Sequence, residues 1–425
     1  TPAWHGASTT VRRGLRLIAN GALDAGNVEQ LADRLGVTSR HLRRLFKTHL
    51  GASPLAVAHT QRLQFAKRLI DQTGLPMAQI AEAAGYKSVR RFNDTFQTTY
   101  GRAPRDLRRH GDTGEIGEVR QATDKAAALS VLLPYRRPFD WQQVLEFLAG
   151  RASPGVEVVT GSSYRRTISI GGQTGLIDVS DVAPRQSLKL QVTGVATTEL
   201  FQVVQTVREM FDLDAPVAEI RKSLVRDPFL RKCLKGRSVV RVPGTWNAFE
   251  LSVRAILGQQ VSVKAATTLA GRLVARFGKA VTPGPGQYQN DEGLTHLFPE
   301  PHDFVRGNFD GLGITVARTS TIRSLARALV DGRLSFDTAQ DPDEFLSSMT
   351  ALPGIGDWTA QYVAMRALKN PDAFPASDLG LMRAFDEEEA RRIKPRELLE
   401  RAEAWRPWRA YAALLLWHSN ANAGG

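Results

Sequence analysis

One carboxylate, two glycines and a tryptophan stand close together late in this sequence. The stretch LPGIGDWTA (352–360) holds Gly354 and Gly356, and FPASDLGL (374–381) holds Asp378. Two glycines around one isoleucine permit a tight turn between helices and leave the first N–H groups of the second helix uncovered. Those groups lie at the positive end of a helix dipole and suit one phosphate. On these residues alone, a packing hairpin without a ligand is equally acceptable, and Asp378 is either an N-cap or a reacting carboxylate.

The positive charge of the chain is concentrated at one end. The 425 residues carry a formal net charge of +13; residues 1–110 hold 18 Lys and Arg against 7 Asp and Glu, and the other 315 residues hold 38 against 36. A charge block confined to one segment favours nucleic acid as a ligand, with a merely solvated basic surface as the alternative. The single cysteine, Cys233, excludes a disulfide framework, a four-thiolate zinc site and a four-cysteine iron–sulfur cluster.

The basic segment contains an internal repeat. Glu29–Pro54 aligns with Ala78–Pro104, and each copy predicts a short helix, a turn at glycine and a second helix capped by serine. The second helices carry side chains of the types that read base edges in a major groove. We expect these residues to contact DNA: Arg40, His41, Arg43, Arg44, Arg90, Arg91 and Asn93. The segment resembles the AraC-type DNA-binding domain, whose connecting helix would be Pro54–Thr73 here; two helical hairpins without a DNA role are the alternative.

The sequence predicts a mainly α, multi-domain protein. Residues 1–110 would form an all-α double helix-turn-helix domain, and residues 111–128 are polar and read as a linker. Residues 129–198 would form a small α+β domain, because one amphipathic helix is followed by short alternating runs typical of an antiparallel meander. Residues 199–425 have a helical pattern and contain the glycine hairpin.

A glycine hairpin, a helix and then a loop aspartate is the arrangement of the helix-hairpin-helix DNA glycosylases. RAILGQQVSV, LPGIGDWTAQYVAMRAL, FPASDLGL and WRPWRAYAALLLW stand in that family's order and resemble DNA-3-methyladenine glycosylase II of the AlkA type over residues 130–420. The resemblance implies an all-α glycosylase domain for 199–425 and an AlkA-type N-terminal domain for 129–198. It also implies base excision of alkylated purines that are flipped out of the duplex.

The resemblance assigns a role to each residue of the expected site. Asp378 would be the catalytic carboxylate, stabilising the cationic sugar and orienting or deprotonating water. The base pocket would comprise Trp358, Tyr362, Trp417 and Phe147. Each of them is also a candidate for ordinary core, and for Phe147 the core interpretation is favoured. The DNA wedge would be Gln259 and Gln260, and the hairpin phosphate site Gly354, Ile355, Gly356 and Thr359. Members that also cut the strand have a lysine where this chain has Trp358, so the resemblance implies a monofunctional enzyme without lyase activity.

The fusion resembles adaptive-response proteins in which regulation and repair share one chain. Such proteins often carry a cysteine-rich, zinc-bound methyl-acceptor domain upstream, whereas Cys233 stands alone in RKCLKG. We expect double-stranded DNA as the partner, no metal, no cofactor except an optional monovalent cation at the hairpin carbonyls, no membrane contact and a monomer. No apolar run approaches the ~20 residues that a membrane span requires, and the sequence begins with no secretory pattern, so we expect the bacterial cytoplasm, at the nucleoid. The alternative is an AraC-type adaptive-response transcription regulator whose glycosylase-like domain senses damage or is inactive.

Overall fold

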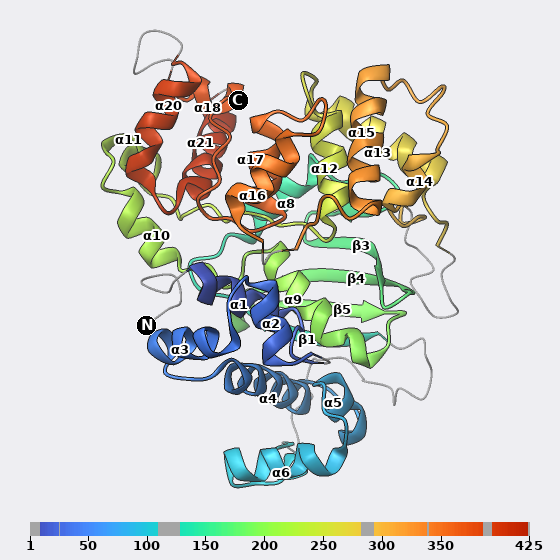
Figure 1. The fold of residues 1–425 in the computed structure, drawn as a ribbon, viewed down its shortest axis with the longest axis vertical. Helices are drawn as coiled ribbons and strands as arrows, with labels where there is room; N and C mark the ends of the chain where they lie inside the picture. The colour runs from blue at the N-terminus through green and yellow to red at the C-terminus, as the bar shows by residue number, and fades with distance from the viewer. Residues whose placement is uncertain are drawn as a thin grey trace. The chain divides into compact units, whose positions relative to one another are not determined.

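The computed structural model describes residues 9–24, 26–108, 128–281, 293–337, 340–385 and 393–423 (Figure 1). It divides into two compact units: residues 1–134, 163–207 and 281–295 form the first, and residues 135–162, 208–280 and 296–425 the second. The described residues are mostly helical with one small antiparallel sheet, which confirms the predicted fold class. The predicted linker, 111–128, lies outside the described residues except for its last position.

The first unit holds the elements of the basic segment and most of the sheet. Its helices are α1 (Thr9–Ala19), α2 (Val28–Arg34), α3 (Ser39–Leu50), α4 (Pro54–Gln72), α5 (Met77–Ala83), α6 (Val89–Tyr100), α7 (Pro104–Leu107) and the short 3-10 turns η1 (Ala183–Arg185) and η2 (Thr197–Glu199). Its strands are β1 (Leu129–Pro134), β3 (Ser163–Ile170), β4 (Gln173–Val182) and β5 (Ser187–Thr193). Helix α9 (Leu200–Met210) runs across the boundary between the units.

The two copies of the repeat fold alike. α2 with α3, and α5 with α6, each form a helix-turn-helix. Leu42 and Phe46 of α3, and Phe92 and Phe96 of α6, are fully buried, because their four-residue spacing places each pair on one helix face. The predicted connecting helix is confirmed as α4, which begins at Pro54 and ends at Gln72.

The cap of the first recognition helix differs from the prediction. Ser39 is the first residue of α3, and the hydroxyl of Thr38 accepts the hydrogen bond from the backbone N–H of His41 at 3.3 Å. In the second copy Ser88 caps α6, as predicted, by accepting from Arg91 N at 3.2 Å. An N-cap residue directly precedes the helix and has extended backbone. Thr38 has that backbone conformation, and its hydroxyl can accept the hydrogen bond that a serine would accept.

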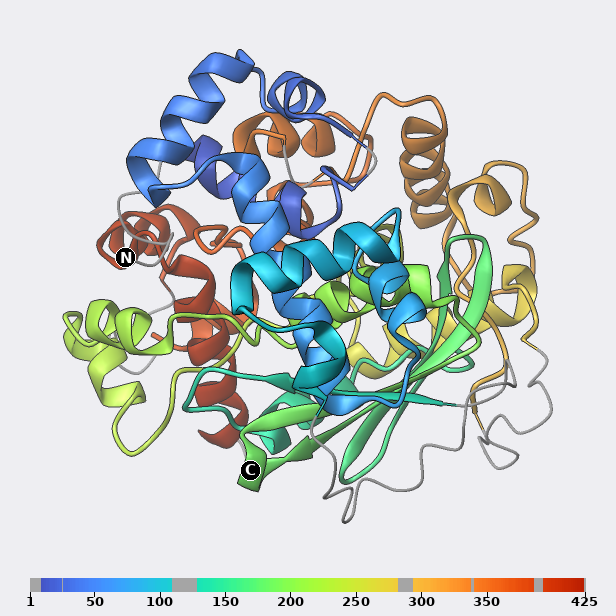
Figure 2. The ribbon, with the colours of Figure 1, turned by 90° about the horizontal axis from the view of Figure 1, so that it is seen from below.

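The helix-turn-helix module packs against the sheet within this unit. Strands β1, β5, β4 and β3 are neighbours in that order, all antiparallel, and Figure 2 shows β3 to β5 side by side as a twisted sheet (green). On α4, the ring of Phe65 meets Phe201 edge-on with centroids 5.1 Å apart, and Oε1 of Gln72 accepts a hydrogen bond from the backbone N–H of Leu132 in β1 at 2.8 Å. The contact therefore combines an aromatic ring pair with one hydrogen bond that satisfies a backbone N–H of the edge strand β1.

The second unit is almost entirely helical. Its helices are α8 (Trp141–Ala149), α10 (Val217–Leu224), α11 (Pro228–Cys233), α12 (Ala248–Leu257), α13 (Val263–Phe277), α14 (Pro301–Val305), α15 (Val316–Val330), α16 (Pro342–Thr350), α17 (Asp357–Arg366), α18 (Leu379–Arg383), α20 (Pro395–Ala402), η3 (Glu403–Trp405) and α21 (Arg409–Ala423), with one short strand, β2 (Glu157–Val159).

Helix α17 anchors the hairpin in the core of this unit. It packs against α12 and α16, and Ala360, Val363, Ala364 and Met365 are fully buried. α18 packs against α21, which brings the residue before α18 close to the side chains of α21. No described helix is both long and apolar enough to span a membrane.

Candidate active site

The two glycines of the hairpin have different structural roles. Between α16 and α17, Gly354 adopts a φ of +82°, and a Cβ added there would overlap Oγ1 of Thr321 on α15. Glycine is therefore required at this position. Gly356 has extended backbone with open space where a Cβ would be, and as the N-cap of α17 it provides no side-chain hydrogen bond. The first N–H groups of α17 thus lack a side-chain cap, as a phosphate site at a helix start requires.

The other residues assigned to the hairpin and wedge are tied to one another. Ile355 and Thr359 are buried, and Oγ1 of Thr359 accepts a hydrogen bond from Nε2 of Gln259 at 3.1 Å. The same nitrogen donates to the carbonyl of Gly354 at 3.0 Å, so Gln259 fastens the loop after α12 to the hairpin. Gln260 is exposed at the tip of that loop with a φ of +55°. The side chain of Gln260, unlike that of Gln259, forms no hydrogen bond with the described residues, and its part as the wedge stays a prediction.

Asp378 is an N-cap and a cavity residue at once. Its Oδ1 accepts hydrogen bonds from the backbone N–H of Leu381 at 2.9 Å and from Nε1 of Trp417 at 2.8 Å. Its Oδ2 accepts from Nε1 of Trp358 at 2.8 Å. Three donors hold the carboxylate in one orientation, and a carboxylate has about four lone-pair sites, so one remains for a further partner. The structure confirms the N-cap, and Asp378 also lines the cavity; its part as a reacting carboxylate stays a prediction.

An aromatic stack forms the wall beside this carboxylate. The rings of Trp358 and Tyr362 are stacked at 5.3 Å with an interplanar angle of 8°, and Trp417 lies 6.3 Å from Tyr362. These rings and Asp378 line a cavity of about 1180 Å³. Phe147 is not in that lining; the guanidinium of Arg151 covers its ring at 4.0 Å. Three of the four aromatic residues assigned to the base pocket are therefore brought together, and the fourth lies behind an arginine.

Three arginines that the sequence analysis did not single out also line the cavity. Arg366 donates from Nη1 to the hydroxyl of Tyr362 at 2.6 Å and from its other two nitrogens to backbone carbonyls. Burial opposes ionisation of Tyr362, but the guanidiniums of Arg366 and Arg151 outweigh it and hold the pKa of the phenol below its ordinary value. Arg366 follows Trp358 and Tyr362 at helical spacing, so its place on their face could have been predicted. No comparable signal marked Arg151.

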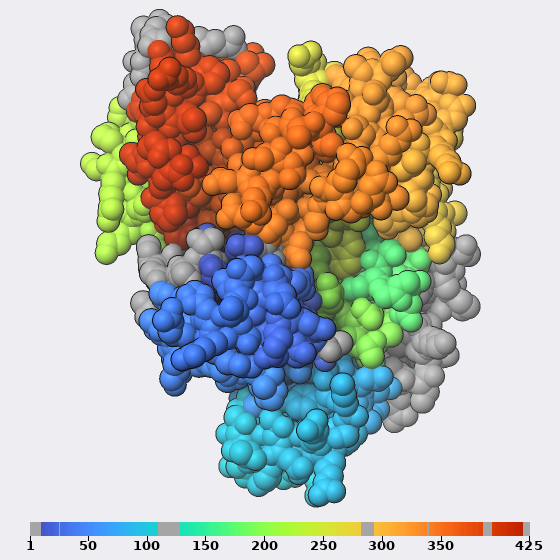
Figure 3. All heavy atoms as spheres, in the orientation of Figure 1, coloured from blue at the N-terminus to red at the C-terminus, as the bar shows by residue number. Residues whose placement is uncertain are grey.

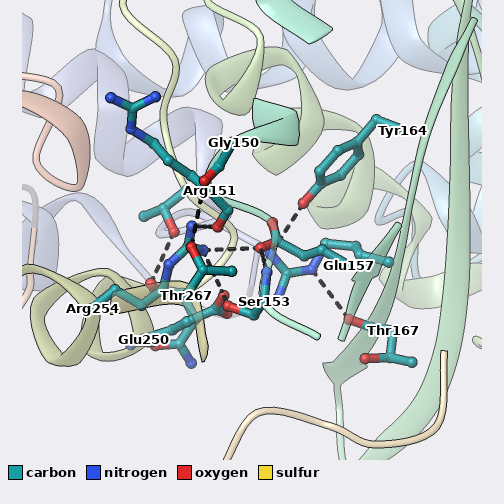
Figure 4. Close-up of polar contacts among 12 residues, drawn as sticks. Gly150, Arg151, Ser153, Glu157, Tyr164, Thr167, Glu250, Arg254 and Thr267 are labelled. Carbon is teal, nitrogen blue, oxygen red and sulfur yellow. Dashed lines mark hydrogen bonds and ion pairs between the residues drawn. The ribbon is translucent and has the colours of Figure 1, made fainter. Parts of the chain in front are cut away.

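Two buried carboxylates hold the third arginine, Arg254 (Figure 4). Its Nη1 lies 2.9 Å from Oε2 of Glu157 and 3.1 Å from Oε1 of Glu250, and its Nη2 donates to the carbonyl of Arg151. Oε2 of Glu157 also accepts from the backbone N–H of Ser153 at 2.9 Å. This network fixes the segment that follows α8 against α12. Of the three arginines that line the cavity, Arg254 is thus paired with two carboxylates, neither of which lines the cavity; Asp378 is the carboxylate of the lining.

Family models match three successive parts of the chain. A helix-turn-helix domain matches residues 31–110, the AlkA N-terminal domain matches residues 130–247, and the HhH-GPD superfamily of base excision DNA repair proteins matches residues 253–410. A probable bifunctional transcriptional activator/DNA repair enzyme AlkA from Mycobacterium tuberculosis is 38% identical over 98% of this chain and 82% of its own length. The chain belongs to the AlkA family of DNA repair enzymes.

Further relatives agree with this assignment. The DNA-3-methyladenine glycosylase 2 of Escherichia coli is 29% identical over 68% of this chain and 96% of its own length. Among solved structures, the 3-methyladenine DNA-glycosylase of Archaeoglobus fulgidus has a TM-score of 0.57 at 23% identity, covering 69% of this chain and 98% of its own. The 8-oxoguanine glycosylase/lyase of Clostridium acetobutylicum has a TM-score of 0.53 at 15% identity, covering 68% of this chain and 96% of its own. The two structures support the fold.

This chain is an AlkA-type glycosylase of the DNA-3-methyladenine glycosylase family of hydrolases, fused to an AraC-type helix-turn-helix domain, and DNA is its partner. The comparisons favour this interpretation over that of a regulator with a glycosylase-like sensor.

The recognition helices of the first unit expose most of the residues assigned to DNA. Arg40 on α3, and Arg90, Arg91 and Asn93 on α6, are exposed and form no side-chain hydrogen bond or ion pair within the described part of the chain. The other three have partners on the same module: Arg43 pairs with Glu29 at 2.9 Å, and Arg44 lies 3.0 Å from Nδ1 of His41. These contacts are solvent-exposed and are therefore weak enough to yield to a phosphate or a base.

Proposed function

We propose that this chain removes alkylated purines of the 3-methyladenine type from double-stranded DNA, by hydrolysis of the N-glycosidic bond and without cutting the strand. The observation that carries the proposal is the carboxylate of Asp378, held by two indoles at the edge of a stacked aromatic wall. The names of the relatives from Escherichia coli and Archaeoglobus fulgidus support the class of lesion.

The wall and the carboxylate serve successive parts of the reaction. Alkylation at a ring nitrogen makes the purine cationic, and a flipped cationic base stacks well on Trp358 and Tyr362. When the C1′–N bond breaks, its electron pair leaves with the base, and the sugar becomes an oxocarbenium ion. The carboxylate of Asp378 stabilises that charge, while water adds to C1′ and its proton passes to the carboxylate or to solvent. Glu157 and Glu250 pair with Arg254, so part of the positive charge of the cavity arginines is compensated where a cationic base would bind.

Product chemistry follows from the residues that line the cavity. Strand cleavage by a glycosylase requires an amine that forms a Schiff base with the sugar. Among the described lining residues there is no lysine, and the position two after Gly356 is Trp358. Release of the base would therefore leave an intact strand with an abasic site.

The test is base release by the full chain from a duplex with one 3-methyladenine analogue or methylated purine. We expect the free base in the supernatant, an intact strand until alkali is added, no borohydride-trapped protein–DNA adduct, and full activity in EDTA because the proposed reaction uses no cofactor. The matching single strand should react more slowly, and light scattering should give a monomer. Strand breaks before alkali, or a trapped adduct, would overturn the monofunctional mechanism; absence of base release would overturn the substrate class.

A further inference from the structure

A second hollow in the second unit lies beside the hairpin and is lined by arginines. It has a volume of about 740 Å³ and is bounded by the loop before α15, one face of α15, Arg333 and Pro353 of the hairpin turn. The hairpin helices, orange in Figure 3, lie at the molecular surface. None of the residues of this hollow lines the cavity at Asp378.

One stripe of α15 supplies donors to this hollow. Ser320, Arg323, Ser324 and Arg327 recur at spacings of three and four residues, which places them on one helix face. From Ser320 to Arg327 the stripe is about 10 Å long. One strand of B-DNA carries a charge about every 3.4 Å along the axis, so the stripe is long enough to follow two or three phosphates.

The guanidiniums of the stripe differ in how they are held. Arg323 is anchored, because its Nη2 donates to the carbonyl of Gly307 at 2.7 Å and its guanidinium lies over Phe309 at 5.2 Å. Its Nε is buried and finds no hydrogen-bond partner among the described residues. Arg327 is exposed and, within the described ranges, its side chain forms no hydrogen bond or ion pair. One arginine is thus preorganised, and the next one along the helix is free to bind.

The charge of the hollow suits an anion. Its lining contains Arg323, Arg327 and Arg333 against one acidic residue, Asp310. Arg333 makes an exposed ion pair with Asp331 at 3.1 Å, and an exposed pair of this kind contributes little and can be exchanged for a phosphate. The lining therefore keeps an excess of positive charge.

The hairpin packs directly against the helix that carries the stripe. Gly354 packs so closely on Thr321 of α15 that a Cβ would not fit between them. A DNA strand whose phosphate is bound at the start of α17 is therefore placed near Ser320, the residue before Thr321, and Arg327, six residues after it on the same helix.

We propose that this hollow is a second phosphate-binding site for DNA, in which Arg327 and Arg333 contact backbone phosphates next to the one held by the hairpin, with Arg323 as a fixed donor and Ser320 as an exposed hydroxyl donor. The site adds register and affinity but no sequence preference, as phosphate contacts do. It relies on the chain's being a DNA-binding protein and does not depend on which base is excised.

The test measures binding of the full chain to a short duplex with a stable abasic-site analogue over a range of salt concentrations. Arg327→Ala should weaken binding on the order of tenfold, as expected for one charge-assisted contact, and should lower the slope of log K against log salt by about 0.9. Arg327→Ala/Arg333→Ala should lower the slope further, and Arg327→Lys should restore most of it. The matched control is Arg396→Ala on α20, where an exposed arginine pairs with Glu400 away from the hairpin.

A second arm identifies the phosphates. Neutral methylphosphonates are placed singly along each strand, and binding of wild type and Arg327→Ala is compared. A position that weakens the wild type but not Arg327→Ala is the phosphate contacted, and its strand shows whether the site takes the damaged or the complementary strand. Equal salt slopes for Arg327→Ala and Arg396→Ala, or no methylphosphonate position that depends on Arg327, would overturn the proposal. Because the duplex contains no base to excise, a failure of the proposed lesion class would leave this result unaffected.

Discussion

Asp378→Asn is the substitution that separates the catalytic part of this carboxylate from its structural part. The amide keeps the shape of the side chain but removes the charge that would face the sugar cation. Loss of one preorganised electrostatic partner costs about 2.7–4 kcal/mol of transition-state stabilisation, or ~10²–10³ in rate. The amide also has a single acceptor oxygen, whereas the indoles of Trp358 and Trp417 donate to two different oxygens. One indole N–H would therefore face an NH₂ group, at a cost of about 1–3 kcal/mol in stability.

The chain offers a closely matched control in Asp227. Like Asp378, it is an N-cap: its Oδ1 accepts from two backbone N–H groups, and its Oδ2 accepts from Nε1 of Trp405 at 2.9 Å. It does not line the cavity at Asp378. Asp227→Asn should thus lower the melting temperature about as much as Asp378→Asn does, roughly 2–4 °C per kcal/mol for a domain of this size. It should leave base release unchanged.

The assay is single-turnover base release from a methylated duplex, with enzyme in excess, alongside thermal melting of both variants. The expected pattern is a loss of rate in Asp378→Asn alone and a loss of stability in both. If Asp378→Asn released base as fast as the wild type, the carboxylate would not be the catalytic group. If Asp227→Asn lost the same activity, the effect of Asp378→Asn would be structural.

Three further outcomes follow from single contacts. Gly354→Ala should lower the melting temperature and weaken duplex binding, because the positive φ at this position costs other residues about 1–3 kcal/mol and the new methyl group overlaps Thr321. Gly356→Ala, which has open space for its methyl group, should melt near the wild type. Equal melting temperatures for the two variants would contradict the packing argument. The pKa of Tyr362 is lower in the folded chain than in the unfolded one, so its ionisation stabilises the fold above that pKa and the gain is lost as pH falls through it. The free energy of unfolding of the wild type relative to Tyr362→Phe should therefore rise as pH approaches ~10, and a flat or falling difference in denaturant titrations would refute the electrostatic assignment. Burial raises the pKa of the Cys233 thiol, so its reaction with a disulfide reagent at pH ~8 should be slower than that of free cysteine, and an equal rate would contradict this.

Much of the architecture could be predicted from local sequence patterns. The repeat in residues 1–110 was readable because a glycine turn and buried residues four apart repeat at an almost constant offset, and each of those signals acts within a few residues. Its one error, Ser39 in place of Thr38 as a cap, has the same origin: two neighbouring hydroxyl residues look alike in sequence, and only the backbone angles tell which one precedes the helix.

The candidate site was only partly readable for a different reason. Arg151, Arg254 and Arg366 come from three segments far apart in the chain, and Glu157 holds Arg254 across one of those separations, whereas Glu250 is its i,i+4 neighbour on α12. No sequence period links the three arginines or joins Glu157 to Arg254, because a side chain can reach any neighbour that folding brings within a few ångströms. The same holds for Gln259, which the sequence assigned to the wedge and which the structure ties to the hairpin 95 residues later.

The sequence by itself determined which residue types stand at the hairpin, at Asp378 and on the recognition helices, since turns, caps and helix faces depend on near neighbours. Only the tertiary structure decided how those residues are used. It gave Asp378 two indole donors, placed Phe147 behind Arg151, and set the arginine stripe of α15 beside the hairpin through the missing Cβ of Gly354. These are long-range contacts, and their geometry is set by how the helices pack rather than by any one segment.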